Sequence, residues 1–176
     1  VFKSPMGNTC RHTVNARVGE DALLVVAPDP ITCFADARYH QQQQVDLSPG
    51  GSLVLVDWLT SGRRARHECW MFSHYYSRIN IVYDQRHVFL ESLLLDPADG
   101  PIDSPFRLGR FHCMALLVFV GPALQQISAA VIDEVSQQPI EQDCSLVQAA
   151  SPIPFGAVLR VLGTDTESVG RVLRSR

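Results

Sequence analysis

The sequence predicts a mainly β protein of one domain, with about two α-helices in its C-terminal third. Apolar and polar residues alternate through much of the first two-thirds of the chain, and this two-residue period is typical of half-buried strands. Helical spacing of apolar residues appears only in the last third. The chain has 176 residues, 46 % hydrophobic and 19 % charged, which suits one globular domain with a substantial core.

The first predicted strands precede residue 50. Alternation of apolar and polar residues indicates a strand at 14–18, and a short apolar run at 23–27 ends at the turn signal Pro28-Asp29-Pro30. Residues 39–47 contain four consecutive glutamines, Gln41 to Gln44. Polar side chains suit a strand with one open edge, so we interpret this segment as an exposed edge strand.

Four further strands are predicted before the helical region. Residues 53–59 are apolar except for Asp57. Residues 79–83 and 88–95 are expected to form a hairpin around a short polar turn. The apolar run 113–120 is interpreted as a buried strand, because it is too short for a membrane-spanning helix of roughly twenty residues.

The last third contains the predicted helices. Pro122 suits a first helical position, and the helical apolar stripe that follows consists of Leu124, Ile127, Val131 and Val135. Pro139 prevents continuation of this helix. Residues 158–162 are predicted to be a strand, and a second helix is expected near Thr164, because Thr164-x-x-Glu167 is a capping-box pattern.

Charge and cysteine usage exclude several classes of protein. The net charge of −3 does not favour nucleic-acid binding, which requires a basic face. The five cysteines are scattered and odd in number, which argues against a disulfide framework and suits a reducing compartment. We therefore expect a soluble, cytoplasmic protein that binds neither nucleic acid nor membrane.

Two acids stand out in residues 53–70. Asp57 lies within an apolar strand and Glu68 precedes the next predicted strand, and burying either is costly without a partner. In one interpretation they oppose each other on neighbouring strands and are neutralised by Arg63 or Arg78. In the other they line a water-filled polar path through the sheet, where carboxylates favour a hard or borderline cation.

Arginines and tyrosines near these acids are candidate partner contacts. Arg63, Arg64 and Arg66 are consistent either with a solvated turn or with docking to an acidic partner surface. Tyr75 and Tyr76 are adjacent, so in a strand they point to opposite faces. Both suit a core or a sheet face, and one of them is a candidate for exposure at an interface.

Recognisable catalytic and metal motifs are missing from the sequence. His67-Glu68 lacks the second histidine of the zinc motif H-E-x-x-H, and His67 with Cys69 would need ligands from distant residues to hold an ion. A buried thiol beside a surface imidazole explains that pair equally simply. The nucleophile elbow G-x-S-x-G, the phosphate loop and the dinucleotide fingerprint do not occur.

A co-linear series of short motifs runs through the whole chain. The series consists of Phe2-Lys3-Ser4, Pro28-Asp29-Pro30-Ile31, Phe34-x-x-Ala37-Arg38-Tyr39, Asp57-Trp58, Gly62-Arg63 with Glu68 five residues later, and 159–163 before a short helix. This series resembles the UreD family of urease accessory proteins, called UreH in some bacteria. No single motif is as specific as a phosphate loop. His67 departs from the family, which usually has Gly before the Glu.

The resemblance implies a stacked, β-helix-like arrangement of strands and a maturation factor without turnover. Its implied partners are UreF-like and UreG-like accessory proteins and the urease apoprotein, with nickel in transit rather than a tightly bound cofactor. Asp57 and Glu68 become candidate lining of a nickel tunnel. The chain would be one UreD-like domain over 1–176, a fragment without the family's Gly-rich N-terminal segment and Trp-containing C-terminal helix.

Two alternatives belong to other functional classes. One is a generic β-rich protein-binding module, which would show no nickel-dependent phenotype. The other is a hydrolase that uses Asp57 and Glu68 as general acid and base. The second alternative requires one concave pocket that holds both carboxylates, at least one of them with a raised pKa.

Overall fold

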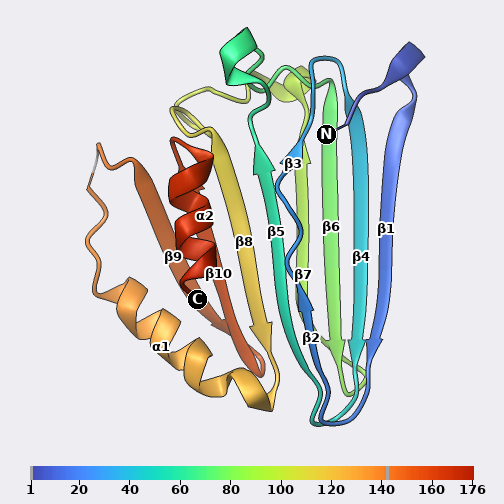
Figure 1. Cartoon of the computed structure of the whole chain (residues 1–176), viewed down its shortest axis with the longest axis vertical. Helices are drawn as coiled ribbons and strands as arrows, with labels where there is room; N and C mark the ends of the chain where they lie inside the picture. The colour runs from blue at the N-terminus through green and yellow to red at the C-terminus, as the bar shows by residue number, and fades with distance from the viewer. Residues whose placement is uncertain (1, 142) are drawn as a thin grey trace.

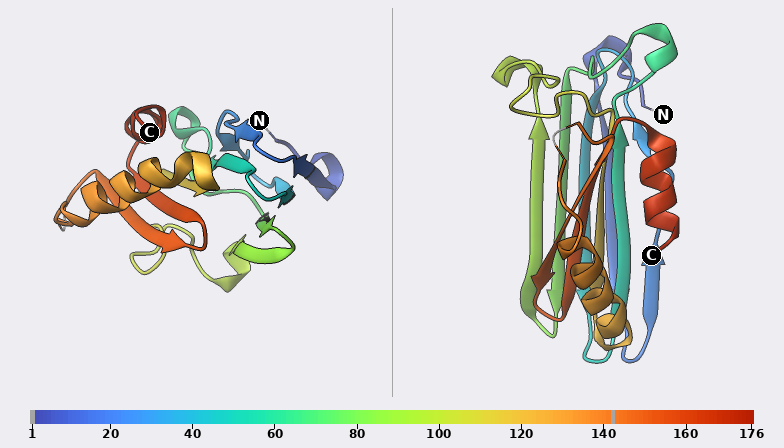
Figure 2. Two further views of the ribbon diagram at one scale, coloured as in Figure 1. Left: turned by 90° about the horizontal axis from the view of Figure 1, so that it is seen from below. Right: turned by 90° about the vertical axis from the view of Figure 1, so that its left-hand side faces the viewer.

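The computed structural model describes residues 2–141 and 143–176, in which two β-sheets are stacked face to face. Two α-helices cover the outer face of one sheet and leave the other sheet bare (Figures 1 and 2). This arrangement confirms the mainly β fold class with two helices in the last third of the chain.

The smaller sheet has four strands in the order β1 (Thr9–Val18), β4 (Arg38–Leu47), β6 (His74–Tyr83) and β7 (Arg86–Leu95). The larger sheet has the order β2 (Leu23–Val26), β5 (Ser52–Thr60), β8 (Cys113–Val120), β10 (Gly156–Gly163) and β9 (Leu146–Ile153), with β3 (Ile31–Thr32) also beside β5. The helices are α1 (Gln125–Ser136) and α2 (Thr166–Arg174), and short 3₁₀ turns lie at Pro5–Gly7, Arg64–Arg66, Pro97–Asp99 and Pro122–Leu124.

The first half of the chain coils between the two sheets. It passes from β1 to β2 and β3, returns to β4, crosses to β5 and returns to β6. As a result β1, β4 and β6 are parallel neighbours, and so are β2 and β5. β3 also pairs parallel with β5. The pairs β5–β8, β8–β10, β10–β9 and β6–β7 are antiparallel, so the stacked, β-helix-like part is followed by antiparallel pairing.

The two-residue period of the strands builds a core between the sheets. Val45 and Leu47 of β4 face Leu53 and Leu55 of β5, and all four are buried. Burial of each such side chain contributes about 1.5–3 kcal/mol to the hydrophobic term. A second apolar cluster around Phe72 fills the other end of the sandwich.

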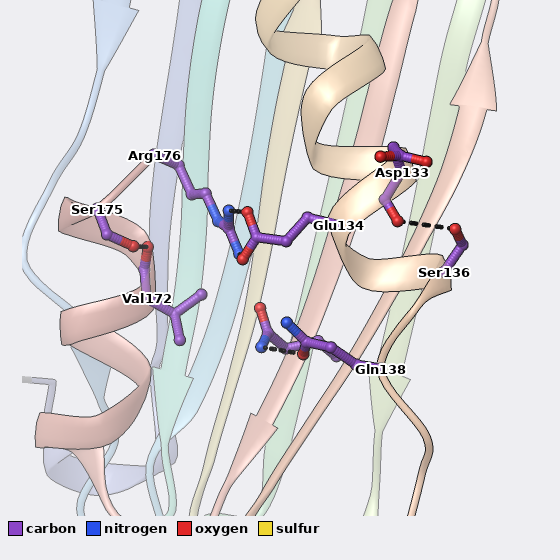
Figure 3. A network of polar contacts seen from close by, with 8 residues as sticks. Asp133, Glu134, Ser136, Gln138, Val172, Ser175 and Arg176 are labelled. Atoms are coloured by element: carbon purple, nitrogen blue, oxygen red, sulfur yellow. Dashed lines mark hydrogen bonds and ion pairs between the residues drawn. The ribbon is translucent and has the colours of Figure 1, made fainter.

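A third apolar layer lies between the larger sheet and the helices. Phe119 of β8 and Leu159 of β10 pack there against Val131 and Val135 of α1. The two helices are tied together by the ion pair of Arg176 with Glu134, in which Arg176 Nη2 lies 2.9 Å from Glu134 Oε1 (Figure 3). The helices therefore form one cover over this face of the larger sheet.

The glutamine segment is not an edge strand, contrary to the sequence-based expectation. β4 pairs with β1 on one side and with β6 on the other. Gln41 and Gln43 are only 3 % and 6 % exposed. The composition was misleading because half of these amides point inward, where Gln41 meets polar partners, while Gln42 on the opposite face is exposed.

The helical region also differs in detail from the prediction. Ile127 is 38 % exposed and Ser128 is buried instead, so the buried stripe is shifted by one residue at this turn. The N-cap of α2 is Asp165, whose carboxylate accepts a hydrogen bond from Ser168 N at 2.7 Å, and not Thr164. The sequence did not indicate β9, a strand at the sheet edge that contains Pro152.

Two further features concern the helices and the cysteines. Among the helices of residues 2–141 and 143–176, none is long and apolar enough to cross a membrane. All five cysteines are free thiols. Cys33 and Cys113 are buried, and burial raises the pKa of each thiol to about 12, which makes them structural rather than reactive.

Candidate functional site

A polar cluster interrupts the apolar core between the sheets, and Asp57 is its centre. On β5, Asp57 lies on the inward face between Leu55 and Leu59. Gln41 Nε2 donates to Asp57 Oδ1 at 2.9 Å, and Ser77 Oγ donates to Oδ2 at 2.9 Å. Both carboxylate oxygens are thus satisfied by neutral donors, and the expected neutralisation of Asp57 by Arg63 or Arg78 is wrong.

The cluster continues toward the edge of the smaller sheet. Tyr39 OH donates to Gln41 Oε1 at 2.9 Å, and His12 Nδ1 lies 3.3 Å from the same oxygen. His12 belongs to the edge strand β1 and is exposed. Hydrogen-bonded side chains therefore connect the solvent beside β1 with Asp57 in the interior.

Burial dominates the electrostatics of Asp57. Desolvation raises the pKa of its carboxyl group, and the hydrogen bonds from Gln41 and Ser77, which lower the pKa, only partly offset this effect. The nearby Tyr75 is fully buried, and burial together with the Asp57 carboxylate holds the pKa of its phenol well above the usual value. An ionised Asp57 carboxylate is therefore unfavourable when it has no positive charge beside it, and a nearby cation would stabilise this ionised form.

A cavity of about 370 Å³ adjoins Asp57 and Ser77. Apolar side chains from β7, β8, β9 and β10 supply most of its wall: Leu93, Met114, Leu116, Val147, Ala149 and Leu162. At its solvent-facing side Arg160 Nη2 lies 2.6 Å from Glu91 Oε2, and this ion pair joins β10 to β7. The volume is in the range of small-ligand sites, and one carboxylate is the main polar feature of its interior.

Glu68 occupies a different place from Asp57. It lies in the loop after the 3₁₀ turn Arg64–Arg66, and it does not line the cavity that Asp57 lines. Arg63 Nε donates to Glu68 Oε2 at 2.9 Å, and this hydrogen bond lowers the pKa of the Glu68 carboxyl group. The predicted pairing of Glu68 with Arg63 is confirmed, but the expected opposition of Glu68 and Asp57 on neighbouring strands is wrong.

This separation removes the geometric basis for the acid–base hydrolase. Such an enzyme needs both carboxylates in one pocket, within reach of the same substrate. Asp57 has a raised pKa inside the sandwich, whereas Glu68 has a lowered pKa in a loop. Among the residues that the structure describes, Asp57 is bonded to Gln41 and Ser77 and Glu68 to Ala35 and Arg63, so the two acids share no hydrogen-bond partner there.

Local packing holds the Arg63–Glu68 loop in place. The Arg63 guanidinium lies 3.8 Å from the centroid of the Phe34 ring, a cation–π contact. Gly62 has φ of 119°, and a Cβ there would lie 2.4 Å from the carbonyl oxygen of Glu68. Arg64 donates to the Thr164 carbonyl at 2.9 Å, which ties the loop to the start of α2.

The remaining candidate partner contacts divide between surface and core. Arg66 is exposed in the same 3₁₀ turn. Tyr75 and Tyr76 point to opposite faces, as predicted, and Tyr75 is fully buried, so it is not available to a partner. Tyr76 lies on the outer face of the smaller sheet, with its ring centroid 4.7 Å from that of His40.

The structure shows no ready-made metal centre. Within residues 2–141 and 143–176, no group of three or more His, Cys, Asp or Glu side chains is placed to hold an ion. His67 and Cys69 lie in the loop before β6 and no third ligand joins them there. An ion that meets Asp57 would find its carboxylate and the Ser77 hydroxyl, because Gln41 turns its amide nitrogen toward Asp57.

Sequence reasoning identified Asp57 but missed its surroundings. Gln41, Ser77, Glu91 and Arg160 were not recognised, because each comes from a different strand of the two sheets. One signal was available: the two-residue period places Gln41 on the same face as the buried Val45 and Leu47.

Comparison with known proteins gives a consistent assignment. The family model described as "UreD urease accessory protein" matches residues 1–175. The urease accessory protein UreD of Sorangium cellulosum is 43 % identical over 175 residues, covering 99 % of this chain and 54 % of that protein. UreD of Anaeromyxobacter sp. is 38 % identical, and the match covers 97 % of this chain and 57 % of that protein. Urease accessory protein D of Arabidopsis thaliana is 40 % identical, and the match covers 100 % of this chain and 68 % of that protein.

The chain spans little more than half the length of the two bacterial relatives. The match nevertheless extends over almost the entire chain and includes the segment that carries Asp57. The chain therefore belongs to the UreD family of urease accessory proteins.

Proposed function

We propose that this chain is a non-enzymatic scaffold for urease maturation. In this proposal it binds the urease apoprotein together with UreF-like and UreG-like proteins, in the cytoplasm, and assists insertion of nickel into the urease active site. The observation that carries the proposal is Asp57: in a UreD-family chain, one half-buried carboxylate stands beside a cavity inside the sandwich.

The chemistry of the Asp57 site suits an ion in transit. The Asp57 carboxylate and the neighbouring Ser77 hydroxyl provide oxygen ligands, which suit hard and borderline divalent cations. One carboxylate is too few to retain Ni²⁺ tightly, so the ion could leave again. Because desolvation disfavours the charged carboxylate, an arriving cation would stabilise the ionised form of Asp57.

Asp57 and Glu68 have different roles in this proposal. Asp57 contacts the nickel ion on the interior path. Glu68 is held by Arg63, and we assign it to maintaining the shape of the loop rather than to the interior path. Arg63, Arg64 and Arg66 remain candidate contacts for a partner, since they lie in a loop at one end of the sandwich.

The test is complementation of a strain that lacks the gene, with nickel content of purified urease measured by mass spectrometry. Asp57→Ala should lower nickel per active site at least severalfold while the accessory complex still co-purifies. Asp29→Ala, at an exposed loop position, is the matched control. Fully nickel-loaded urease in the deletion strain would overturn the proposed function, whereas normal loading with Asp57→Ala would overturn only the role of Asp57.

A further inference from the structure

The outer face of the smaller sheet is open to solvent. α1 packs against β9 and β10, and α2 packs against β8 and β10, all in the larger sheet (Figure 2). Three of the four strands in the smaller sheet are parallel neighbours. Parallel strands usually have both faces covered, so a bare face of this kind is a candidate for burial by another molecule.

Positive charge is concentrated on this face. The strand register places four arginines on its outward side: Arg11, Arg17, Arg38 and Arg78. The outward side of β1, β4, β6 and β7 carries one aspartate, Asp46, and Asp96 lies at the rim beside His74. The chain as a whole has a net charge of −3, so this basic face is a local feature and not a reflection of composition.

Apolar and aromatic groups lie beside the arginines. Leu90 and Leu94 on β7 are 57 % and 46 % exposed, and Leu94 stands opposite Tyr76. Tyrosine and arginine are enriched at protein–protein interfaces, and exposed leucines supply apolar area for a buried centre. The exposed leucines favour a folded protein over nucleic acid, because they offer apolar contact area that a phosphate backbone does not use.

The face is ordered without a partner. Asn80 Nδ2 donates to Gln44 Oε1 at 2.7 Å, and Gln44 Nε2 donates to Asp46 Oδ1 at 2.5 Å. Arg11 Nη1 donates to His40 Nδ1 at 3.2 Å. Side chains already held in place lose less conformational entropy on binding, which favours affinity.

The size of the face is also adequate. Four ten-residue strands, at a spacing of about 4.8 Å and a rise of about 3.3 Å per residue, present roughly 600 Å². A standard protein interface buries about 800 Å² on each partner. The sheet face and its rim therefore approach the area that a specific complex needs.

We propose that the outer face of β1, β4, β6 and β7 docks an acidic surface of a folded protein partner. The inference rests on the proposed function for its candidate partners, which are the urease apoprotein and the UreF-like and UreG-like proteins. The arginines set orientation and association rate, and the strip of Leu90, Leu94 and Tyr76 supplies the apolar contact.

The experiment measures binding of the purified chain to each of the three purified proteins from the same organism, at low and high salt. The double variant Arg11→Glu/Arg78→Glu should weaken at least one interaction by tenfold or more and reduce its salt dependence. Arg171→Glu/Arg174→Glu on α2 makes the same change of charge on the opposite side of the molecule and should alter affinity less than twofold. Circular dichroism melting confirms that both variants are folded.

The outcomes separate the two proposals. If the wild-type chain binds a partner and Arg11→Glu/Arg78→Glu binds it equally well, the docking face is wrong and the proposed function stands. If the wild-type chain binds none of the three proteins, the proposed function fails and the docking face falls with it. Binding of a short single-stranded RNA that depends on Arg11 and Arg78 would contradict a protein partner for this face.

Discussion

Arg160 on β10 and Glu91 on β7 join the two sheets beside the internal cavity, with Arg160 Nη2 2.6 Å from Glu91 Oε2. Both side chains are partly exposed, so the ion pair contributes little to folding stability, on the order of 0–1 kcal/mol. Its importance is positional. It marks where the cavity meets solvent. Arg160 is paired directly with Ala149 of the neighbouring strand β9, which also lines the cavity.

A bulky side chain at the solvent-facing side of the cavity, near Arg160 and Glu91, should impair nickel delivery without unfolding the protein. Ala149 is exposed and lines the cavity, so Ala149→Phe can place its ring over the cavity without displacing the core. We expect stability to change by about 0.5 kcal/mol or less, and nickel per urease active site to fall severalfold. Ala130→Phe, at an exposed position of α1, is the control. Normal nickel loading with Ala149→Phe would exclude this cavity from the path.

Asp57→Asn should stabilise the fold at neutral pH. The folded-state pKa of Asp57 is raised, so folding favours the protonated carboxyl group. The stability contributed by this group is fully present below its unfolded-state pKa, near 3.8, and is lost as the pH rises through the folded-state pKa. Asparagine stays neutral, so the variant should exceed wild type by on the order of 1 kcal/mol at pH 7.

Urea denaturation at pH 7 and at pH 4 or below measures this effect. The advantage of Asp57→Asn should shrink at the lower pH, while Asp29→Asn should match wild type at neutral pH. A variant that is less stable than wild type at pH 7 would mean that the hydrogen bonds from Gln41 and Ser77 to the charged carboxylate outweigh desolvation.

Gly62→Ala should destabilise the loop that holds Glu68. Gly62 has φ of 119°, a conformation that L residues rarely adopt, and a Cβ would lie 2.4 Å from the Glu68 carbonyl oxygen. We expect a loss of about 1–3 kcal/mol in urea denaturation. Gly19→Ala is the control, because a Cβ at Gly19 meets nothing within 4 Å. Equal stability of the two variants would show that the loop relaxes freely.

The cysteines should fall into two classes of reactivity. Cys33 and Cys113 have a pKa of about 12, so their thiolate fraction at pH 8 is very small. Cys10, Cys69 and Cys144 are only half-buried. Alkylation of the native protein followed by peptide mass spectrometry should label only these three, and denaturation should expose all five. Rapid native labelling of Cys33 would contradict the packing around Phe72.

Local patterns predicted most strands and both helices. The hairpin of β6 and β7, the buried strand β8 and the helix that follows Pro122 lie where the spacing of apolar residues placed them. β9 was missed because small and polar residues, with Pro152, give an edge strand no strong period. Asp165 replaces Thr164 as the N-cap of α2, since both residue types cap well and they are adjacent in the chain.

The site was predictable only in part. Asp57 was recognised as an acid in an apolar strand, and the Arg63–Glu68 pair follows from two residues five positions apart in one loop. The environment of Asp57 was mispredicted, because Gln41 and Ser77 come from strands that precede and follow β5 in the chain and lie in the opposite sheet.

The sequence by itself determined the β-rich class, the family and the side of each strand that faces inward, since the two-residue period is a local property of the chain. Only the tertiary structure decided that the glutamine strand is internal, that Asp57 and Glu68 are separated, and that a basic sheet face stays open. These properties depend on which strands become neighbours. That choice is made by long-range packing between segments, which local spacing does not encode.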